Sequence, residues 1–132
     1  MPVFDDYLNH LDENKKKHVY VIDNASFEDL KFWYAAADLF VYPVVAEGFG
    51  IPPIEAAMAG IPVICNKATA MGDFNFFRDC LIDINDNDLL DEKIKRQLES
   101  PYDTDNVKRC IQEKYNWRNS AEILKRALLN NN

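Results

Sequence analysis

Short apolar runs alternate with helical patterns along the middle of the chain. Three runs rich in β-branched and aromatic residues predict buried strands, namely HVYVI at 18–22, LFVY at 39–42 and PVIC at 62–65. CLIDI, at residues 80–84, is a fourth candidate strand. Between these runs, apolar residues recur every three or four positions, as they do on one face of a helix. Strands that alternate with helices in this way predict an α/β fold with a parallel sheet.

Local signals place the helices before, between and after these strands. Ser26 stands three residues before Asp29, a variant of the capping box, and opens a helix that precedes the strand at 39–42. A further helix, with Pro52 and Pro53 in its first turn, is expected between the second and third strands. We also expect helices at residues 3–11, 85–99, 105–114 and 120–129. Trp117, ahead of the last of these, is expected to anchor in the core because tryptophan buries a large area.

Length and composition are those of an ordinary globular protein. A chain of 132 residues with 48% hydrophobic and 28% charged residues is long enough for one domain with its own core. No linker or internal repeat interrupts it, so we expect a single domain over residues 1–132. Three cysteines lie far apart without a CxxC spacing, which argues against a zinc site or a disulfide framework and predicts buried thiols.

The acidic charge and the hydropathy pattern limit the partners and the location. A net charge of -7 argues against nucleic acid as a partner, because lysines and arginines drive that binding. No apolar run approaches the length of a transmembrane segment, and the N-terminus has no apolar signal core. We therefore expect a cytoplasmic protein.

The stretch from 43 to 62, PVVAEGFGIPPIEAAMAGIP, is where the chain predicts chemistry. Gly48 and Gly50 allow a tight turn and the close approach of a ligand after the strand at 39–42. Pro52 and Pro53 then fall in a first helical turn, where proline is well tolerated. The N-terminus of a helix placed at the carboxyl end of a strand predicts an anion site.

Two glutamates flank this turn and require another explanation, since a carboxylate repels a phosphate. Each carboxylate has two oxygens, which suit a pair of vicinal hydroxyls on a ribose or a hexose. Glu47 and Glu55 are expected on the order of 10 to 15 Å apart, a span that fits a ligand with sugars at both ends. On spacing alone, the plainer interpretation is a capped, solvent-facing Glu47 and a Glu55 on the helix surface.

The run YPVVAEGFGIPPIEAAMAGIPVI, at residues 42–64, resembles the donor-site signature of retaining GT-B glycosyltransferases, the family 4 or "glycosyl transferases group 1" type. It matches that signature without insertion or deletion, from Glu-Gly-Phe-Gly through Glu-Ala to Gly-Ile-Pro-Val. SFEDLKFWYAAADLFVYP and YNWRNSAEILKRAL are similar, more loosely, to the elements that precede and end that domain. The resemblance covers residues 18 to 129 and implies a Rossmann-like parallel sheet flanked by helices.

The resemblance also implies a role for each residue of the signature. Glu47 would be the catalytic residue beside the donor sugar, and Glu55 would accept hydrogen bonds from the ribose hydroxyls. The donor sugar and diphosphate would be bound by Gly48, Phe49, Gly50 and Ile51. The base would pack against Asp23, Asn24 and Ala25. The implied reaction transfers a hexosyl group from a UDP or GDP sugar to an acceptor glycan or lipid with retention, and it needs no metal or other cofactor.

The chain departs from the family pattern in two ways. It has no N-terminal acceptor domain and no first βα unit, whose Arg and Lys neutralise the diphosphate in the family. Lys67 is the one basic residue nearby, and we expect it to be an ordinary loop lysine. The sheet is therefore expected to be incomplete, and the chain to be inactive alone and to act as part of a larger enzyme. A second chain that supplies the missing strands and acceptor domain is an expected partner, and the parent enzyme would bring the chain to the membrane periphery.

Two other functions remain open from the sequence. A non-catalytic nucleotide-sugar-binding or regulatory module would keep the same pocket without turnover. An acidic α/β signalling receiver fits the length and charge, but Asp23 alone does not form the acidic cluster that such a receiver needs.

Overall fold

The computed structural model describes residues 2–129 of the chain. They fall into two compact units, Met1–Lys31 and Phe32–Asn132. The first unit contains α1 (Pro2–His10), the short α2 (Glu13–Lys16) and the beginning of α3 (Phe27–Ala36). None of the described helices is long and apolar enough to cross a membrane.

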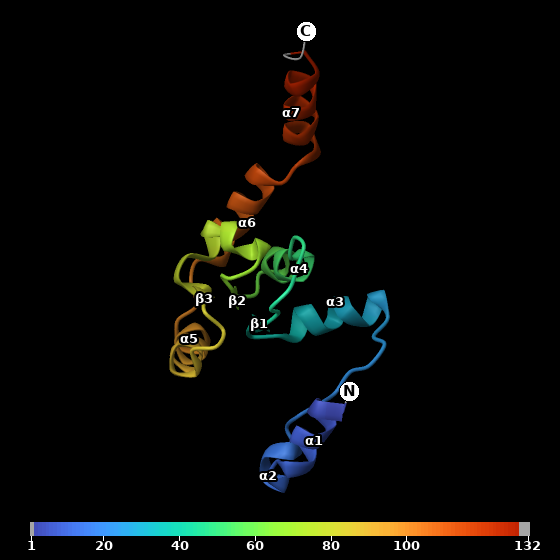
Figure 1. Cartoon of the computed structure of the whole chain (residues 1–132), viewed down its shortest axis with the longest axis vertical. Helices are drawn as coiled ribbons and strands as arrows, with labels where there is room; N and C mark the ends of the chain where they lie inside the picture. The colour runs from blue at the N-terminus through green and yellow to red at the C-terminus, as the bar shows by residue number, and fades with distance from the viewer. Residues whose placement is uncertain (1, 130–132) are drawn as a thin grey trace. The chain divides into compact units, whose positions relative to one another are not determined.

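A three-stranded parallel sheet lies in the second unit, in the order β1-β2-β3 (Figure 1). Its strands are β1 (Phe40–Tyr42), β2 (Val63–Asn66) and β3 (Leu81–Ile82). The central strand β2 is buried along its whole length, as expected for a parallel strand with neighbours on both sides. The predicted α/β fold with a parallel sheet flanked by helices is confirmed.

Helices and turns of the second unit connect and cover these strands. Between β1 and β2 the chain passes through α4 (Ile51–Ala59), which packs against both strands and against α6. The remaining elements are η1 (Ala70–Asp73), η2 (Asn75–Cys80), α5 (Asn87–Glu99), α6 (Thr104–Lys114) and α7 (Trp117–Leu129). All the helices predicted from the sequence are present, with boundaries shifted by a few residues.

The core contains a segment, residues 70–80, that lies between the predicted strands and carries no predicted helix. Met71 of η1, Phe77 of η2 and Phe74 between them are fully buried in the same core as β2. They recur every three positions, the period of a 3₁₀ helix, whereas the patterns that predict helices and strands have periods of 3.6 and 2. The loop between β2 and β3 is therefore part of the hydrophobic core.

The strand predicted at 18–22 is wrong. These residues form no strand in the structure, and the side chains of Val19 to Ile22 are between 42% and 77% exposed. A strand exists only where a neighbour pairs with its backbone N–H and C=O groups. Within the described residues, no strand pairs with this segment.

Two smaller predictions also differ from the structure. Trp117 is 91% exposed rather than in the core, because α7 buries none of its described side chains. The fourth strand keeps only two of the five residues expected at 80–84. Cys80 still belongs to η2, and the Asp83 carboxylate accepts a hydrogen bond from the Asn85 N–H at 3.0 Å, which turns the chain away from the sheet.

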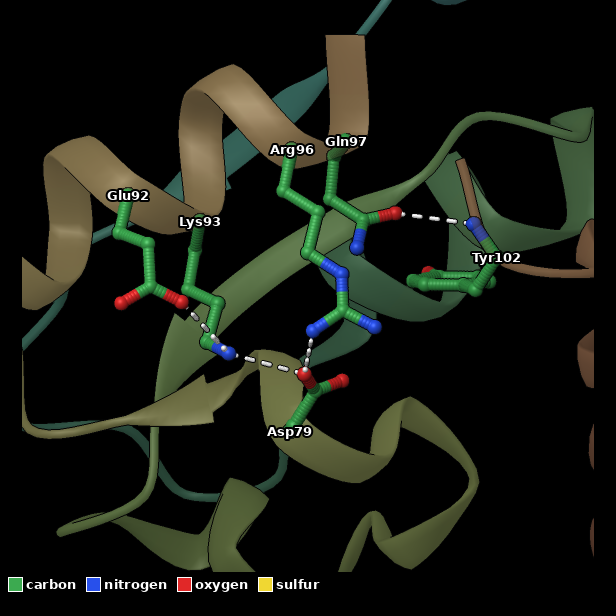
Figure 2. A network of polar contacts seen from close by, with 6 residues as sticks. All are labelled: Asp79, Glu92, Lys93, Arg96, Gln97 and Tyr102. Carbon is green, nitrogen blue, oxygen red and sulfur yellow. Dashed lines mark hydrogen bonds and ion pairs between the residues drawn. The ribbon is translucent and has the colours of Figure 1, made fainter. Parts of the chain in front are cut away.

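A polar network fixes α5 against η2 (Figure 2). The Asp79 carboxylate accepts hydrogen bonds from Lys93 Nζ at 2.8 Å and Arg96 Nη1 at 2.9 Å. The Lys93 side chain is only 10% exposed, so this carboxylate balances a nearly buried ammonium group. The hydrogen bond from Lys93 is the main reason that the pKa of Asp79 lies below its ordinary value.

A second set of contacts joins the end of α5 to the central strand. The Gln97 side-chain oxygen accepts a hydrogen bond from the Tyr102 N–H at 3.0 Å (Figure 2). The Tyr102 hydroxyl in turn accepts a hydrogen bond at 2.8 Å from the backbone N–H of Val63, the first residue of β2. The segment after α5 therefore completes the backbone hydrogen bonding of β2.

Candidate functional site

The candidate site lies where β1 ends and the chain turns into α4. Gly50 is the N-cap residue of α4 and Ile51 its first residue, with prolines at the next two positions. No side chain caps this end of the helix. The predicted order of strand, tight turn and helix N-terminus is confirmed, at the carboxyl end of the strand.

The two glycines of the turn serve different purposes. Gly50 has φ +96°, and a Cβ there would lie 2.6 Å from Met71 Cγ and 3.1 Å from Phe74 Cε2. Only glycine suits both that backbone conformation and that space. A Cβ at Gly48 would meet no atom within 4 Å, so the surroundings of that glycine are open. The turn thus packs on the core at Gly50 and faces open space at Gly48.

Glu47 is held by three hydrogen-bond donors. Its Oε1 accepts from the backbone N–H groups of Gly48 at 3.0 Å and Phe49 at 3.4 Å. Its Oε2 accepts from the Tyr42 hydroxyl at 2.9 Å. These bonds, the one from Tyr42 foremost, hold the pKa of Glu47 below its ordinary value. The carboxylate is therefore ionised at neutral pH and acts as an acceptor.

At the start of α4, fewer backbone N–H groups are available to bind an anion than the sequence predicted. The N–H of Phe49, expected to bind the donor, is directed at the Glu47 carboxylate. Pro52 and Pro53 have no N–H, so Ile51 is the one donor in the first three positions of α4. A phosphate at this helix end therefore has the Ile51 N–H and the helix dipole available to it.

Phe49 fixes the turn to α6 through aromatic contacts. Its ring is 43% exposed and meets Phe74 and Tyr115 edge to face, with centroids 5.5 and 5.3 Å apart. Tyr115 is the residue that ends α6. The aromatic ring of the turn is thus a packing group in this structure.

Glu55 lies on the exposed side of α4, one turn after the helix begins. Its Oε2 accepts a hydrogen bond from the Tyr34 hydroxyl at 3.3 Å. Burial, followed by the charge of Glu55, raises the pKa of Tyr34 to about 12, so the phenol stays protonated and can donate. The ring of Tyr34 packs edge to face against Phe40 with centroids 5.6 Å apart. Glu55 therefore has one fixed partner and an otherwise open carboxylate.

Sequence reasoning missed the side chains that hold the site together. Tyr34 and Tyr42 entered the prediction only as apolar positions of a helix and a strand. Asn66, at the end of β2, is buried, and its Nδ2 donates to the Val44 carbonyl at 3.2 Å, which attaches the beginning of the turn to the sheet. The signal available in the sequence was Asn66 itself, a polar residue directly after the apolar run of a buried strand.

The remaining predicted contacts lie elsewhere in the chain. Asp23 to Ala25, the predicted base-binding residues, belong to the first unit, and their role stays a prediction. Lys67 follows β2 with an exposed side chain, and its backbone N–H donates to Ile82 O at 2.9 Å. The structure confirms its placement in a loop.

Comparison with known proteins gives consistent matches. The family model described as glycosyl transferases group 1 matches residues 5–117. The chain is 40% identical to O-antigen chain mannosyltransferase B of Escherichia coli over 72 residues, which are 54% of this chain and 19% of that protein. It is 29% identical to MMP alpha-(1->4)-mannosyltransferase of Mycolicibacterium hassiacum over 110 residues, 78% of this chain and 27% of that protein.

A third relative, serotype-specific mannosyltransferase WbdA of Escherichia coli, is 28% identical over 105 residues, 73% of this chain and 12% of that protein. The chain thus spans less than a third of the length of these relatives. No solved structure matches it significantly.

Proposed function

The chain belongs to the glycosyl transferases group 1 family, and on that basis we propose that it forms the donor-binding part of a retaining GT-B mannosyltransferase. The donor is a UDP or GDP sugar, and the acceptor is a hydroxyl of a glycan or a lipid. The relatives described above are all named mannosyltransferases, which supports the choice of sugar. The arrangement of Glu47 and Glu55 around the start of α4 is the single structural observation that supports donor binding most directly.

Glu47 is assigned to the donor sugar. Because its carboxylate is ionised, it accepts a hydrogen bond from a sugar hydroxyl and does not donate a proton. In the transfer, the bond between the anomeric carbon and the diphosphate breaks with its electron pair on the diphosphate. The acceptor oxygen then bonds to the same face of that carbon and passes its proton to the departing diphosphate. A nearby carboxylate stabilises the positive charge that develops on the sugar ring.

Glu55 is assigned to the ribose of the nucleotide. Its carboxylate is exposed and has a single protein partner, so both oxygens retain positions that can accept from ribose hydroxyls. The backbone of Gly50 and Ile51, between the two glutamates, faces the diphosphate in this proposal. A Cβ at Gly48 would meet no atom within 4 Å, so this side of the turn leaves room for the sugar.

Transfer requires groups from outside this chain. The stretch 43–62 contains no lysine or arginine, and the chain has a net charge of -7. A departing diphosphate needs fixed positive charge or a metal ion, and the proposed reaction uses no metal. The rest of a larger enzyme, in the same or a second polypeptide, would supply that charge, the missing strands and the acceptor site. We place this enzyme in the cytoplasm, at the membrane periphery where the acceptor is a lipid.

Binding of nucleotide sugars tests the proposal. We expect calorimetry or ligand-observed NMR to detect a GDP or UDP sugar, with GDP-mannose, UDP-glucose and ADP-glucose as probes. Glu55→Ala should weaken binding of the preferred donor roughly tenfold or more, since a hydrogen bond to a charged group contributes about 1.5–3 kcal/mol. Glu99→Ala, an exposed glutamate at the end of α5, is the matched control and should bind as the native chain does.

The same experiments also distinguish a glycosyltransferase from a non-catalytic nucleotide-sugar-binding module. If no nucleotide sugar binds even when the remainder of the enzyme is supplied, donor binding is refuted. If the donor binds but the assembled protein transfers no sugar, the chain is a non-catalytic nucleotide-sugar-binding module.

A further inference from the structure

We propose that Tyr42 is a positioning residue that fixes the Glu47 carboxylate so that it accepts a single hydroxyl of the donor sugar. The inference rests on the proposed function for the identity of the ligand. Its structural part, the orientation of Glu47 by Tyr42, stands on contacts within the protein. Tyr42 is the last residue of β1, and its hydroxyl lies 2.9 Å from Glu47 Oε2.

The Tyr42 side chain is itself held in place. Its backbone pairs with Cys65 of the buried strand β2, and its ring stacks on Phe40 with centroids 5.8 Å apart. Burial, followed by the hydrogen bond to Glu47, raises the pKa of the phenol, so it remains a donor at neutral pH. The O–H therefore acts from a fixed position at the end of the sheet.

The two oxygens of Glu47 have different partners, and this sets the orientation of the group. Oε1 accepts from the two backbone N–H groups of Gly48 and Phe49, whereas Oε2 accepts from the Tyr42 hydroxyl. Rotating the carboxylate away from this orientation breaks bonds on both sides. The turn engages one oxygen, and Tyr42 attaches the other to the sheet.

The number of hydrogen bonds that Glu47 already accepts limits how many more the donor sugar can make with it. A carboxylate offers about four acceptor positions. Three donors lie within hydrogen-bond distance of Glu47, and the Gly50 N–H also helps to lower its pKa. At most about one position is left for the ligand, on the side that is open at Gly48. Glu47 therefore receives one sugar hydroxyl and does not bridge a vicinal pair, while Glu55, with one partner, is free to do so.

The carboxyl titration of Glu47 tests the positioning without any ligand. Carboxyl ¹³C NMR of the native chain and of Tyr42→Phe, which loses only the hydroxyl, would give the pKa of Glu47 in each. We expect an upward shift of about half a unit or more in Tyr42→Phe, because it removes one of the hydrogen bonds to the charged form. Tyr34→Phe, which removes a phenol O–H beside Glu55 instead, should leave Glu47 unchanged. An unchanged Glu47 in Tyr42→Phe overturns the proposal.

A reciprocal variant covers the case in which Tyr42→Phe fails to fold. In Glu47→Gln the phenol of Tyr42 no longer faces a negative charge, so its pKa should fall, as measured by NMR of ζ-¹³C-labelled tyrosine. A Tyr42 titration that does not respond to Glu47→Gln also refutes the contact.

The affinity for the sugar donor then tests whether the orientation of Glu47 by Tyr42 contributes to sugar binding. We expect Tyr42→Phe to weaken GDP-mannose by about three- to tenfold and to leave GDP unchanged, because GDP has no sugar for Glu47 to contact. Equal affinity of the native chain and Tyr42→Phe for GDP-mannose would refute the role in sugar binding. If no nucleotide sugar binds even when the remainder of the enzyme is supplied, while Glu47 still shifts in Tyr42→Phe, the proposed function fails and the orientation of Glu47 by Tyr42 stands.

Discussion

Replacing Gly50 by alanine should destabilise the protein far more than the same change at Gly48, two residues earlier. At Gly50 the alanine must adopt φ +96°, which costs about 1–2 kcal/mol for a residue with a Cβ. Its Cβ would also lie 2.6 Å from Met71 Cγ and 3.1 Å from the ring of Phe74. Met71 is flexible but fully buried, so moving it adds an overpacking cost of about 1–3 kcal/mol.

An effect of the substitution on the unfolded state offsets a small part of this loss of stability. Alanine has less conformational freedom than glycine when unfolded, which stabilises the fold by about 0.4–1 kcal/mol at either position. The expected net loss for Gly50→Ala is therefore about 1–4.6 kcal/mol, with about 3 kcal/mol near the middle of the range. Gly48→Ala meets no atom within 4 Å and has no positive φ, so its net effect should lie between zero and a small gain.

Urea unfolding followed by circular dichroism measures this difference. With a slope of about 1–3 kcal/mol per molar urea, Gly50→Ala should lower the unfolding midpoint by about 1 M or more without changing the slope. The Gly48→Ala midpoint should stay at or slightly above that of the native chain. Free energies of unfolding within about 0.5 kcal/mol of each other for the two variants would refute the assignment of Gly50 to a core contact.

Two further predictions concern ionisable groups in the second unit. Asp79→Asn should cost about 1 kcal/mol at pH 7, a value reduced for the partial exposure of Asp79, because Lys93 loses its closer charged partner and keeps Glu92 at 3.5 Å. The folded pKa of Asp79 is lowered, so its contribution is present above the unfolded pKa of about 3.9 and is lost as pH falls through the folded pKa. Urea unfolding at pH 7 and pH 3 should show the native chain and the variant converging at low pH, and a constant difference would contradict this. For the cysteines, burial raises the pKa of Cys65 to about 12 and of Cys80 to about 11, so iodoacetamide at pH 8 should label the half-buried Cys110 first. Peptide mass spectrometry after a short exposure checks the order, and early labelling of either buried thiol would contradict the packing.

Much of the fold around β1 and β2 was predictable because local signals and tertiary structure agree there. Both strands are short apolar runs bounded by prolines, and the predicted turn into α4 has glycine at its N-cap. Ser26 and Asp29 form the predicted reciprocal cap, since the Asp29 N–H donates to Ser26 Oγ at 3.1 Å and the Ser26 N–H to Asp29 Oδ2 at 3.3 Å. These features depend on residues within a few positions of each other.

Features that depend on distant partners were not predictable. The segment 18–22 has the composition of a strand, but composition does not supply the neighbour that pairs with it. Lys93 and Gln97 are buried on α5 whereas the apolar Leu98 is 54% exposed, because the polar network with η2 determines which side of the helix faces inward. Hydropathy assigns a lysine to the surface and contains no information about its carboxylate partner.

The candidate site also combines features that were predictable from the sequence with features that were not. The positions of Glu47, Gly50 and the start of α4 follow from the sequence of the turn. The side-chain geometry does not, because it depends on how the turn folds back on β1 and brings Glu47 within reach of the Tyr42 hydroxyl. The base-binding role of 23–25 remains a prediction.

The hydrogen bond between Tyr102 and Val63 has a consequence for the order of folding. The first amide of the central strand depends on a residue 39 positions later in the chain. Closing so long a loop is entropically costly, and non-local contacts of this kind slow folding. During synthesis, β1, α4 and β2 emerge before that partner exists. A nascent chain ending before Tyr102 therefore leaves its most buried strand incompletely bonded, and we expect the sheet to become resistant to proteolysis only after the segment beyond α5 has been made.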